Sequence, residues 1–144
     1  MGITFVKRNM SLPLSTVFIV DDDPSVRRSL SRLVKQAGFD GHAFSSAEEF
    51  LQKITGPLSR PSCLVADLQM PGLSGLDLQH ALSCSLAACP VILISGNATL
   101  PDTTLAIKQG AVTFLPKPSD PERLLRAIDE ALERHRATLH GKGT

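Results

Sequence analysis

Short apolar runs alternate with segments of helical periodicity along most of the chain. Residues 17–20 form a continuous β-branched and aromatic run, which is typical of a strand buried on both faces. From Pro24 the apolar positions recur at helical spacing, and Gly38 follows the last of them as a helix C-cap. The same alternation continues to the end of the chain. It predicts further strands at 40–44, 63–67, 91–95 and 112–115 and further helices at 47–54, 75–84, 101–109 (ended by Gly110) and from Pro121 onward.

These five strand–helix pairs predict the fold class. Strict alternation implies right-handed crossovers and a parallel sheet that helices cover on both faces. We therefore predict an α/β fold, a single doubly wound (βα)5 domain around a central five-stranded parallel sheet. Ligands of such sheets bind at the carboxyl ends of the strands, so the polar residues just after each strand are the candidates for function.

Composition limits the possible classes of protein. The chain has 144 residues with 42% hydrophobic residues, which suits one compact domain. A net charge of +1 gives no basic surface for nucleic acid, and no segment approaches the ~20 apolar residues that a membrane span needs. Three cysteines without a secretory leader favour thiols in a reducing compartment, and so a cytoplasmic protein. Residues 1–14 are expected to form a flexible leader, and 138–144 a C-terminal tail or linker stub.

Polar residues collect at the predicted strand ends. The tips of parallel strands meet at one edge of the sheet, so residues far apart in sequence are expected to converge there. Several carboxylates brought together raise one another's pKa unless cations offset the repulsion, and a divalent ion together with one lysine could do so. Oxygen ligands without histidine or cysteine favour Mg²⁺ over Zn²⁺. The residues are Asp21, Asp22 and Asp23 after the first strand, Asp67 after the third, Ser95 and Gly96 after the fourth and Lys117 after the fifth.

One of the three consecutive aspartates has a local explanation. Asp23 precedes Pro24 at the head of a helix, which is the pattern of an N-cap with proline at the first helical position. Asp21 and Asp22 have no such explanation beyond the general acidity of turns after strands. Together with Asp67 and Lys117 they point to a charged site.

Four segments together resemble the receiver domain of two-component response regulators, and most closely its FixJ-type branch. They are "VFIVDDDPSVR", "CLVADLQMPGLSGLDL", "VILISGNA" and "GAVTFLPKP", in the family's order and spacing. The similarity runs from about residue 15 to 137, which we take as the domain. It implies the CheY-like, flavodoxin-like strand order 2-1-3-4-5.

The resemblance also implies roles for the residues at the strand ends. Asp67 would be the phosphoacceptor for a phosphoryl group from a sensor histidine kinase or phosphotransfer protein. Mg²⁺ would be bound directly by Asp22 and Asp67, partly through water by Asp21, and by the backbone carbonyl of Gln69. Lys117 would pair with Asp67 and then with the phosphoryl oxygens.

A conformational switch is implied by the same family pattern. Ser95 would hydrogen-bond the phosphoryl group, and Phe114 stands where the family carries a rotating aromatic residue, although core packing alone would also explain it. The peptide bond between Lys117 and Pro118 would be cis. Gln69 and Asn97 would border the path of hydrolytic water.

The resemblance implies partners but no output domain within these residues. The first helix would dock the kinase, while its arginines, Arg27, Arg28 and Arg32, would equally suit a solvated face. A homodimer through the fourth helix, fifth strand and fifth helix is expected. The fifth helix is followed by too few residues for a helix-turn-helix motif, so no nucleic acid contact is assigned to this domain. The resemblance itself implies a signalling switch rather than an enzyme.

Three alternatives fit parts of the pattern. A haloacid-dehalogenase-like phosphatase also uses an aspartate nucleophile, but it requires an acid where Gln69 stands. A flavodoxin-like electron carrier would need phosphate-binding donors where the first loop is acidic. A pseudo-receiver that only binds partners would not need the complete charged set. The pair His80 and Cys84 has helical spacing for a metal, but structural zinc usually takes four ligands.

Overall fold

A five-stranded parallel sheet forms the centre of the protein. The fold comes from a computed structural model that describes residues 15–96, 113–117 and 120–141. The strands are β1 (Thr16–Val20), β2 (Asp40–Phe44), β3 (Ser62–Asp67), β4 (Val91–Ser95) and β5 (Thr113–Pro116). Their order is β2-β1-β3-β4-β5, and every neighbouring pair is parallel. This confirms the predicted α/β fold and strand order.

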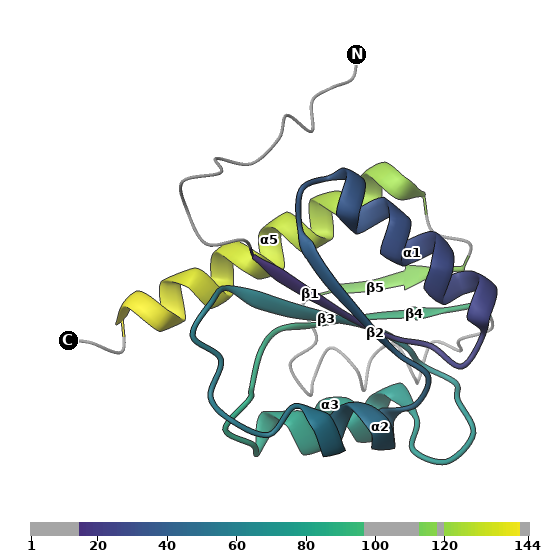
Figure 1. The fold of residues 1–144 in the computed structure, drawn as a ribbon, viewed down its shortest axis with the longest axis horizontal. Coiled ribbons are helices and arrows are strands. Elements are labelled where there is room, and N and C mark those ends of the chain that lie inside the picture. Colours follow the sequence, from purple (N-terminus) through teal and green to yellow (C-terminus); the bar gives the residue numbers. More distant parts are fainter. Residues whose placement is uncertain (1–14, 97–112, 118–119, 142–144) are drawn as a thin grey trace.

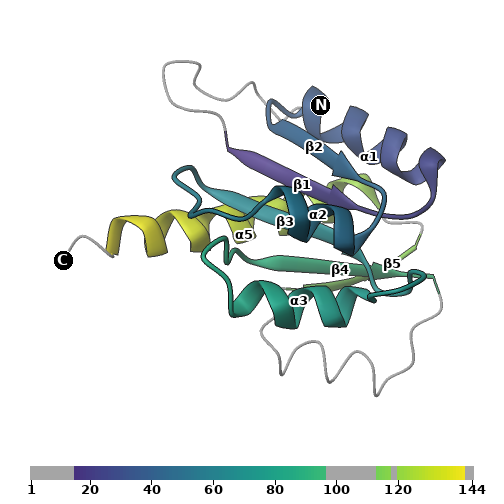
Figure 2. The same cartoon turned by 60° about the horizontal axis from the view of Figure 1, so that its bottom comes forward.

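Helices cover both faces of the sheet (Figures 1 and 2). Helices α1 (Pro24–Gln36) and α5 (Pro121–Gly141) lie on one face, and α2 (Ala47–Lys53) and α3 (Gly75–Ser83) lie on the other. The structure thus describes four of the five predicted helices. The predicted helix at 101–109, its stop at Gly110 and the leader 1–14 lie outside the described residues.

Alternate residues of the strands point into two hydrophobic cores, one on each face of the sheet. Val17 and Ile19 of β1 point towards α1 and α5, where they pack with residues such as Ile128, while Phe18 and Val20 point to the opposite face with Phe50 of α2. All five residues of β1 are buried. A strand buried on both faces has no room for charge along its length, so charged side chains belong at its ends.

The ends of α1 have the caps that the sequence predicts. Asp23 is the N-cap, and its side chain accepts the backbone N–H of Ser25 at 2.9 Å. At the other end Gly38 has φ of 93°, and Phe39 N–H bonds to the carbonyl of Val34 at 3.0 Å, which is a Schellman motif. These two caps fix where the chain leaves β1 and enters β2.

Helix α5 is longer than the sequence suggested. It begins at Pro121, after Asp120 as predicted, and buries Leu125, Ile128 and Leu132. It continues to Gly141, so residues 138–141, which were assigned to a tail, are helical. Periodicity does not separate a polar helix end from a tail, so the sequence does not mark this last turn as helical.

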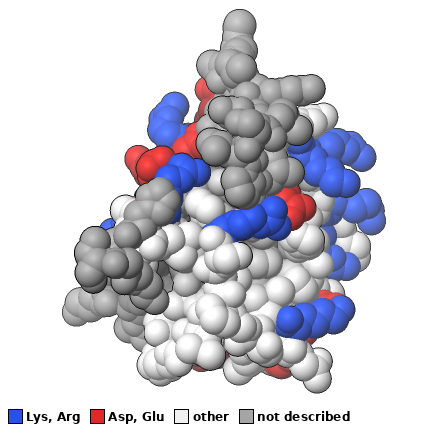
Figure 3. Space-filling view, turned by 60° about the vertical axis from the view of Figure 1, so that its left-hand side comes forward, with Lys and Arg blue, Asp and Glu red and all other residues white. Residues whose placement is uncertain are grey.

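The surface carries charges of both signs. In the view of Figure 3 basic and acidic side chains are interspersed around a largely uncharged area, and neither sign covers the visible face.

All three cysteines are free thiols, with Cys63 buried and Cys84 exposed. Within residues 15–96, 113–117 and 120–141, no helix has the length and apolar character needed to cross a bilayer.

Candidate functional site

Three carboxylates converge at the carboxyl ends of β1 and β3. Asp21 and Asp22 follow β1 directly, and Asp67 is the last residue of β3. Each contributes a ligand oxygen, and these oxygens all lie within 4.8 Å of one another. Asp21 is fully buried and Asp67 is 6% exposed, whereas Asp22 is exposed. The sheet therefore brings together the acidic residues that the strand ends predict.

Lys117 supplies positive charge to this cluster from the end of β5. Its Nζ lies 2.9 Å from Oδ2 of Asp67, with hydrogen-bond geometry, and 3.0 Å from Oδ2 of Asp21 as an ion pair. The backbone N–H of Lys117 donates to the carbonyl of Ser95 at 2.9 Å, which ties the lysine to the end of β4. One ammonium thus bridges two of the three carboxylates.

The electrostatics of the cluster favour a further cation. Burial raises the pKa of Asp21, and the hydrogen bond from Asp23 N–H together with the contact with Lys117 offsets this only in part. Burial alone would lower the pKa of Lys117, but its contacts with Asp67 and Asp21 outweigh this effect and raise it. Asp21 is therefore a carboxylate whose ionised form is disfavoured by its surroundings.

Two contacts hold Asp21 in place. Its Oδ1 accepts the backbone N–H of Asp23 at 2.9 Å. Its carbonyl oxygen accepts Nη1 of Arg27, from the first turns of α1, at 2.7 Å. Sequence reasoning offered a docking or solvated role for Arg27 and missed this contact, because nothing in helical periodicity shows that an arginine folds back onto the preceding loop.

Gly75 is a residue near the site that sequence reasoning did not single out. Its N–H donates to the carbonyl of Leu68 at 2.9 Å, and a Cβ at this position would lie 2.5 Å from the carbonyl oxygen of Asp67. Only glycine allows α3 to begin so close to the end of β3. The available signal was a glycine just inside the capping box of Ser74 and Asp77, where a better helix former is usual.

The oxygen cluster has the donors that Mg²⁺ requires. Asp21, Asp22 and Asp67 offer carboxylate oxygens within reach of one ion. Oδ2 of Asp21 is buried with the ammonium of Lys117 3.0 Å away, and a carboxylate oxygen has a second lone pair that can accept a cation as well. Asp67 also accepts Gln69 N–H through Oδ1 at 3.1 Å. The chemistry of this donor set is compatible with Mg²⁺.

The other predicted site residues differ in burial and in their place in the fold. Ser95 ends β4 and is 3% exposed, and its neighbour across the sheet is Pro116. Phe114 of β5 is half-buried and packs against the core beneath α2 and α3. Gln69 is exposed in the loop after β3. Asn97 and Pro118, and with it the expected cis peptide bond, lie outside the described residues.

The pair His80 and Cys84 stands apart from the acidic cluster. His80 is exposed in the last turn of α3, and Cys84 is its C-cap. Among the residues that the structure describes, the aspartate cluster is the only group of three or more potential ligands close enough for one metal ion.

Comparison with known proteins decides the family. Residues 17–129 match the response regulator receiver domain. The chain belongs to this family. Nodulation protein W of Bradyrhizobium diazoefficiens is 46% identical over 128 residues, which cover 89% of this chain and 56% of the relative. Transcriptional regulatory protein FixJ of the same organism is 36% identical over 116 residues, covering 81% of this chain and 56% of FixJ.

Solved receiver structures support the same branch. The structure titled FixJ-N has a TM-score of 0.75 at 38% identity and covers 85% of this chain and 96% of its own. Response regulator StyR has a TM-score of 0.80 at 38% identity, covering 91% of this chain and 65% of its own. This receiver is of the FixJ type, as its motifs predicted, and the match favours the receiver over the phosphatase alternative. The chain spans about half the length of the curated relatives it matches.

Proposed function

We propose that Asp67 accepts a phosphoryl group from a phosphohistidine of a sensor histidine kinase, and that the phosphorylated receiver controls an output partner or a DNA-binding domain. A carboxylate oxygen of Asp67 bonds to phosphorus while the bond from phosphorus to the histidine nitrogen breaks. The observation that carries this proposal is the contact of Lys117 Nζ with Asp67 and with Asp21, at 2.9 and 3.0 Å. Phosphoryl transfer depends mainly on alignment and on neutralisation of oxygen charge, so a carboxylate beside an ammonium suits it.

Asp22, Asp21, Asp67 and the backbone carbonyl of Gln69 are the residues proposed to hold Mg²⁺. The ion would supply positive charge to the phosphoryl oxygens and to the crowded carboxylates. Asp67 is already oriented by Gln69 N–H on Oδ1 and Lys117 on Oδ2. Because Lys117 contacts Oδ2 of Asp67, it is placed to follow the negative charge from the carboxylate to the new phosphoryl group.

Ser95 and Phe114 are proposed as the switch residues. A hydroxyl at the end of β4 would donate to a phosphoryl oxygen, and this new bond favours one arrangement of the following loop over another. Phe114 lies on the neighbouring strand and is only half-buried, which leaves an aromatic ring with room to change its packing. A population change from 1:99 to 99:1 requires about 5.5 kcal/mol of differential stabilisation, which a few charge-assisted hydrogen bonds can supply.

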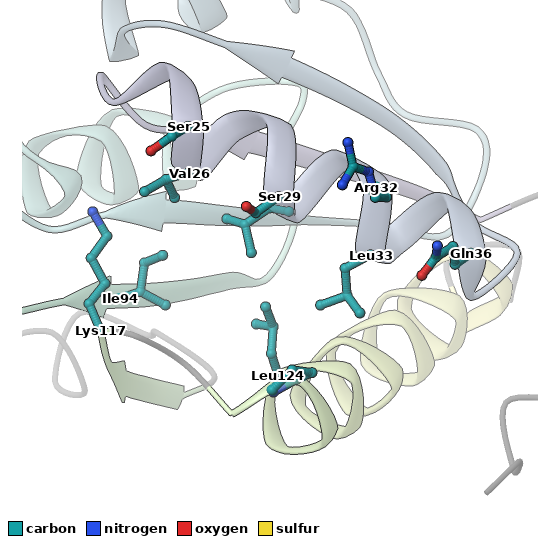
Figure 4. A pocket seen from close by; sticks show the side chains of 11 residues that line it. Ser25, Val26, Ser29, Arg32, Leu33, Gln36, Ile94, Lys117 and Leu124 are labelled. Carbon is teal, nitrogen blue, oxygen red and sulfur yellow. The ribbon is translucent and has the colours of Figure 1, made fainter.

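A groove between α1 and α5 is the proposed docking site for a helix of the kinase. It has a volume of about 620 Å³ and opens beside Lys117. In Figure 4 Leu33 of α1 and Leu124 of α5 point towards each other across it, and Val26 and Ile94 lie between them and the lysine. An apolar groove that leads to Lys117 would seat a partner helix with its phosphohistidine near Asp67.

The proposed homodimer would use the outer face of α5. Arg123, Arg126, Glu130 and Arg134 are exposed there and carry both signs of charge, which suits pairing with a second copy. The fourth helix of this proposed surface lies outside the described residues. We also propose that the protein is cytoplasmic, which the three free thiols support. Its only proposed reaction is the phosphorylation of its own Asp67.

Intact mass after incubation with acetyl phosphate and Mg²⁺ tests the proposal. We expect wild-type protein to gain one phosphoryl group and Asp67→Asn to gain none. Asp40→Asn is the matched control, because Asp40 begins β2 at the opposite end of the sheet and should leave labelling unchanged. Equal labelling of wild type and Asp67→Asn would remove Asp67 from its role, and no labelling of either would defeat the proposed function.

A further inference from the structure

The loop between β3 and α3 carries the Gln69 carbonyl and is anchored at both ends. At its start Leu68 N–H donates to the carbonyl of Ile94 at 2.7 Å, and Gln69 N–H donates to Asp67. At its end Gly75 N–H returns to the carbonyl of Leu68, and Ser74 caps α3. These contacts fix where the loop leaves the sheet and where the helix begins, but they leave residues 70–73 to be held by something else.

A carboxylate from α2 holds the middle of this loop. Oε2 of Glu48 accepts the backbone N–H of Leu73 at 3.1 Å. Among the described hydrogen bonds, it is the only one between residues 70–73 and another element of the fold. The preceding residue, Gly72, has φ of 77°, and a Cβ there would lie 2.5 Å from the same oxygen. The loop therefore takes a left-handed turn at a glycine in order to approach Glu48 closely.

Helix α2 is a firm base for that carboxylate. Glu48 is the second residue of the helix, where negative charge interacts favourably with the helix dipole. Ala47 and Phe50 are fully buried on either side of it in sequence. The neighbouring Glu49 accepts Ser45 N–H and pairs with Lys53, so its contacts stabilise α2 and the residue just before it. Glu48 reaches outward to the loop instead.

We propose that Glu48 is a positioning residue that fixes the conformation of residues 69–73 and thereby prepares the Gln69 carbonyl for Mg²⁺. This inference rests on the proposed function, because it assumes that the aspartate cluster takes the ion. The hydrogen bond preorganises the loop, so that metal binding does not have to order it. Glu48 contacts neither the metal site nor the acceptor directly.

Two measurements test this role on the whole chain. Amide hydrogen exchange of Leu73 in metal-free protein should be about tenfold faster in Glu48→Ala, because the N–H loses its acceptor. Calorimetric titration with MgCl₂ should show roughly fivefold weaker binding, below the 10- to 100-fold that loss of a direct partner of a ligand typically causes. Glu48→Gln keeps an acceptor oxygen and should lie between Glu48→Ala and wild type in both.

Gln52→Ala is the matched control, since Gln52 is exposed on the same helix. It should match wild type in exchange and in Mg²⁺ affinity. The free energy of unfolding in EDTA should fall by no more than about 1 kcal/mol in Glu48→Ala, the loss expected for a charge at a helix N-terminus, so a general loss of stability would not explain the weaker Mg²⁺ binding. Equal Mg²⁺ affinities of Glu48→Ala and wild type would overturn the inference and leave the proposed function intact. Absence of Mg²⁺ binding by wild type would defeat both.

Discussion

The two ends of the central sheet hold polar clusters of opposite character. At the carboxyl ends of the strands, Asp21, Asp22 and Asp67 face one ammonium, so negative charge is in excess. At the amino ends, buried Ser62 N–H donates to Nδ1 of buried His135 at 2.9 Å. The second cluster pairs its polar groups with one another, whereas the first has an excess of carboxylates that a cation can balance.

Ionic groups at the start of β2 and before β3 show the same contrast. Oδ2 of Asp40, at the start of β2, lies 3.0 Å from Nη2 of Arg60 and 3.1 Å from Nε2 of His42, so one carboxylate has two partners. Ser62 Oγ also donates, to the carbonyl of Arg60 at 2.8 Å. Polar groups at this end connect segments of the chain. We infer that the amino edge serves stability and the carboxyl edge serves chemistry, and that substitutions at the two edges will affect different measurements.

The largest effect is expected for Lys117→Ala at the carboxyl edge. Loss of the ammonium leaves the transferred oxygens without their nearest positive charge, and removal of one such preorganised group typically costs about 10²- to 10³-fold in rate. We expect the rate of phosphorylation by acetyl phosphate to fall by that factor, as followed by intact mass over time. Lys53→Ala, which removes an exposed lysine paired with Glu49, should leave the rate unchanged. A rate within threefold of wild type for Lys117→Ala would contradict the role of this lysine.

A smaller effect in free energy is expected for His135→Ala at the amino edge. The substitution removes a buried ring and leaves Ser62 N–H without its acceptor, which together should lower the free energy of unfolding by about 2–3 kcal/mol. Urea denaturation measures this change. The phosphorylation rate should stay near that of wild type under conditions where the variant is folded. His42→Ala, at an exposed histidine of the same edge, should cost less than about 1 kcal/mol.

The contrast between the edges also explains what the sequence could predict. Strand ends in a parallel sheet converge by topology, so the positions of Asp21, Asp67 and Lys117 followed from the order of strands and helices alone. Those residues needed no knowledge of side-chain packing. The caps at Asp23 and Gly38 were predictable for a similar reason, because they depend on a few neighbouring residues.

Contacts between distant segments were not predictable in this way. Ser62 and His135 are separated by 73 positions, and Glu48 and Leu73 by 25. Each pair meets only because one helix, α5 for His135 and α2 for Glu48, has a particular rotation against the rest of the fold, which a single sequence does not fix. In the sequence His135 belongs to none of the motifs at the strand ends, and Glu48 is one of two consecutive glutamates in a helical segment. The supporting contacts of the site were therefore missed, although the charged residues themselves were identified.

The smallest effect, and the one that compares the edges most directly, is expected for Asp21→Asn. Burial raises the pKa of Asp21 above its ordinary value of 3.8 in the folded protein. The folded state therefore binds this proton more tightly than the unfolded state does, and stability from this group is lost as the pH rises through the folded pKa. At pH 7 the ionised carboxylate destabilises the fold, so Asp21→Asn in EDTA should be more stable by about 1 kcal/mol.

Asparagine keeps an oxygen for Asp23 N–H, so the substitution changes charge more than shape. The advantage of Asp21→Asn should shrink as the pH falls towards 3.8, where Asp21 of the wild type is protonated, and added Mg²⁺ should stabilise the wild type more than the variant. Asp40→Asn should have the opposite sign. Although burial favours a higher pKa for Asp40, its bonds to His42 and Arg60 outweigh this and lower it, so its ionised form stabilises the fold at neutral pH. Urea denaturation of both variants at pH 4 and pH 7 measures the difference, and equal signs would show that the two edges do not differ as the charges indicate.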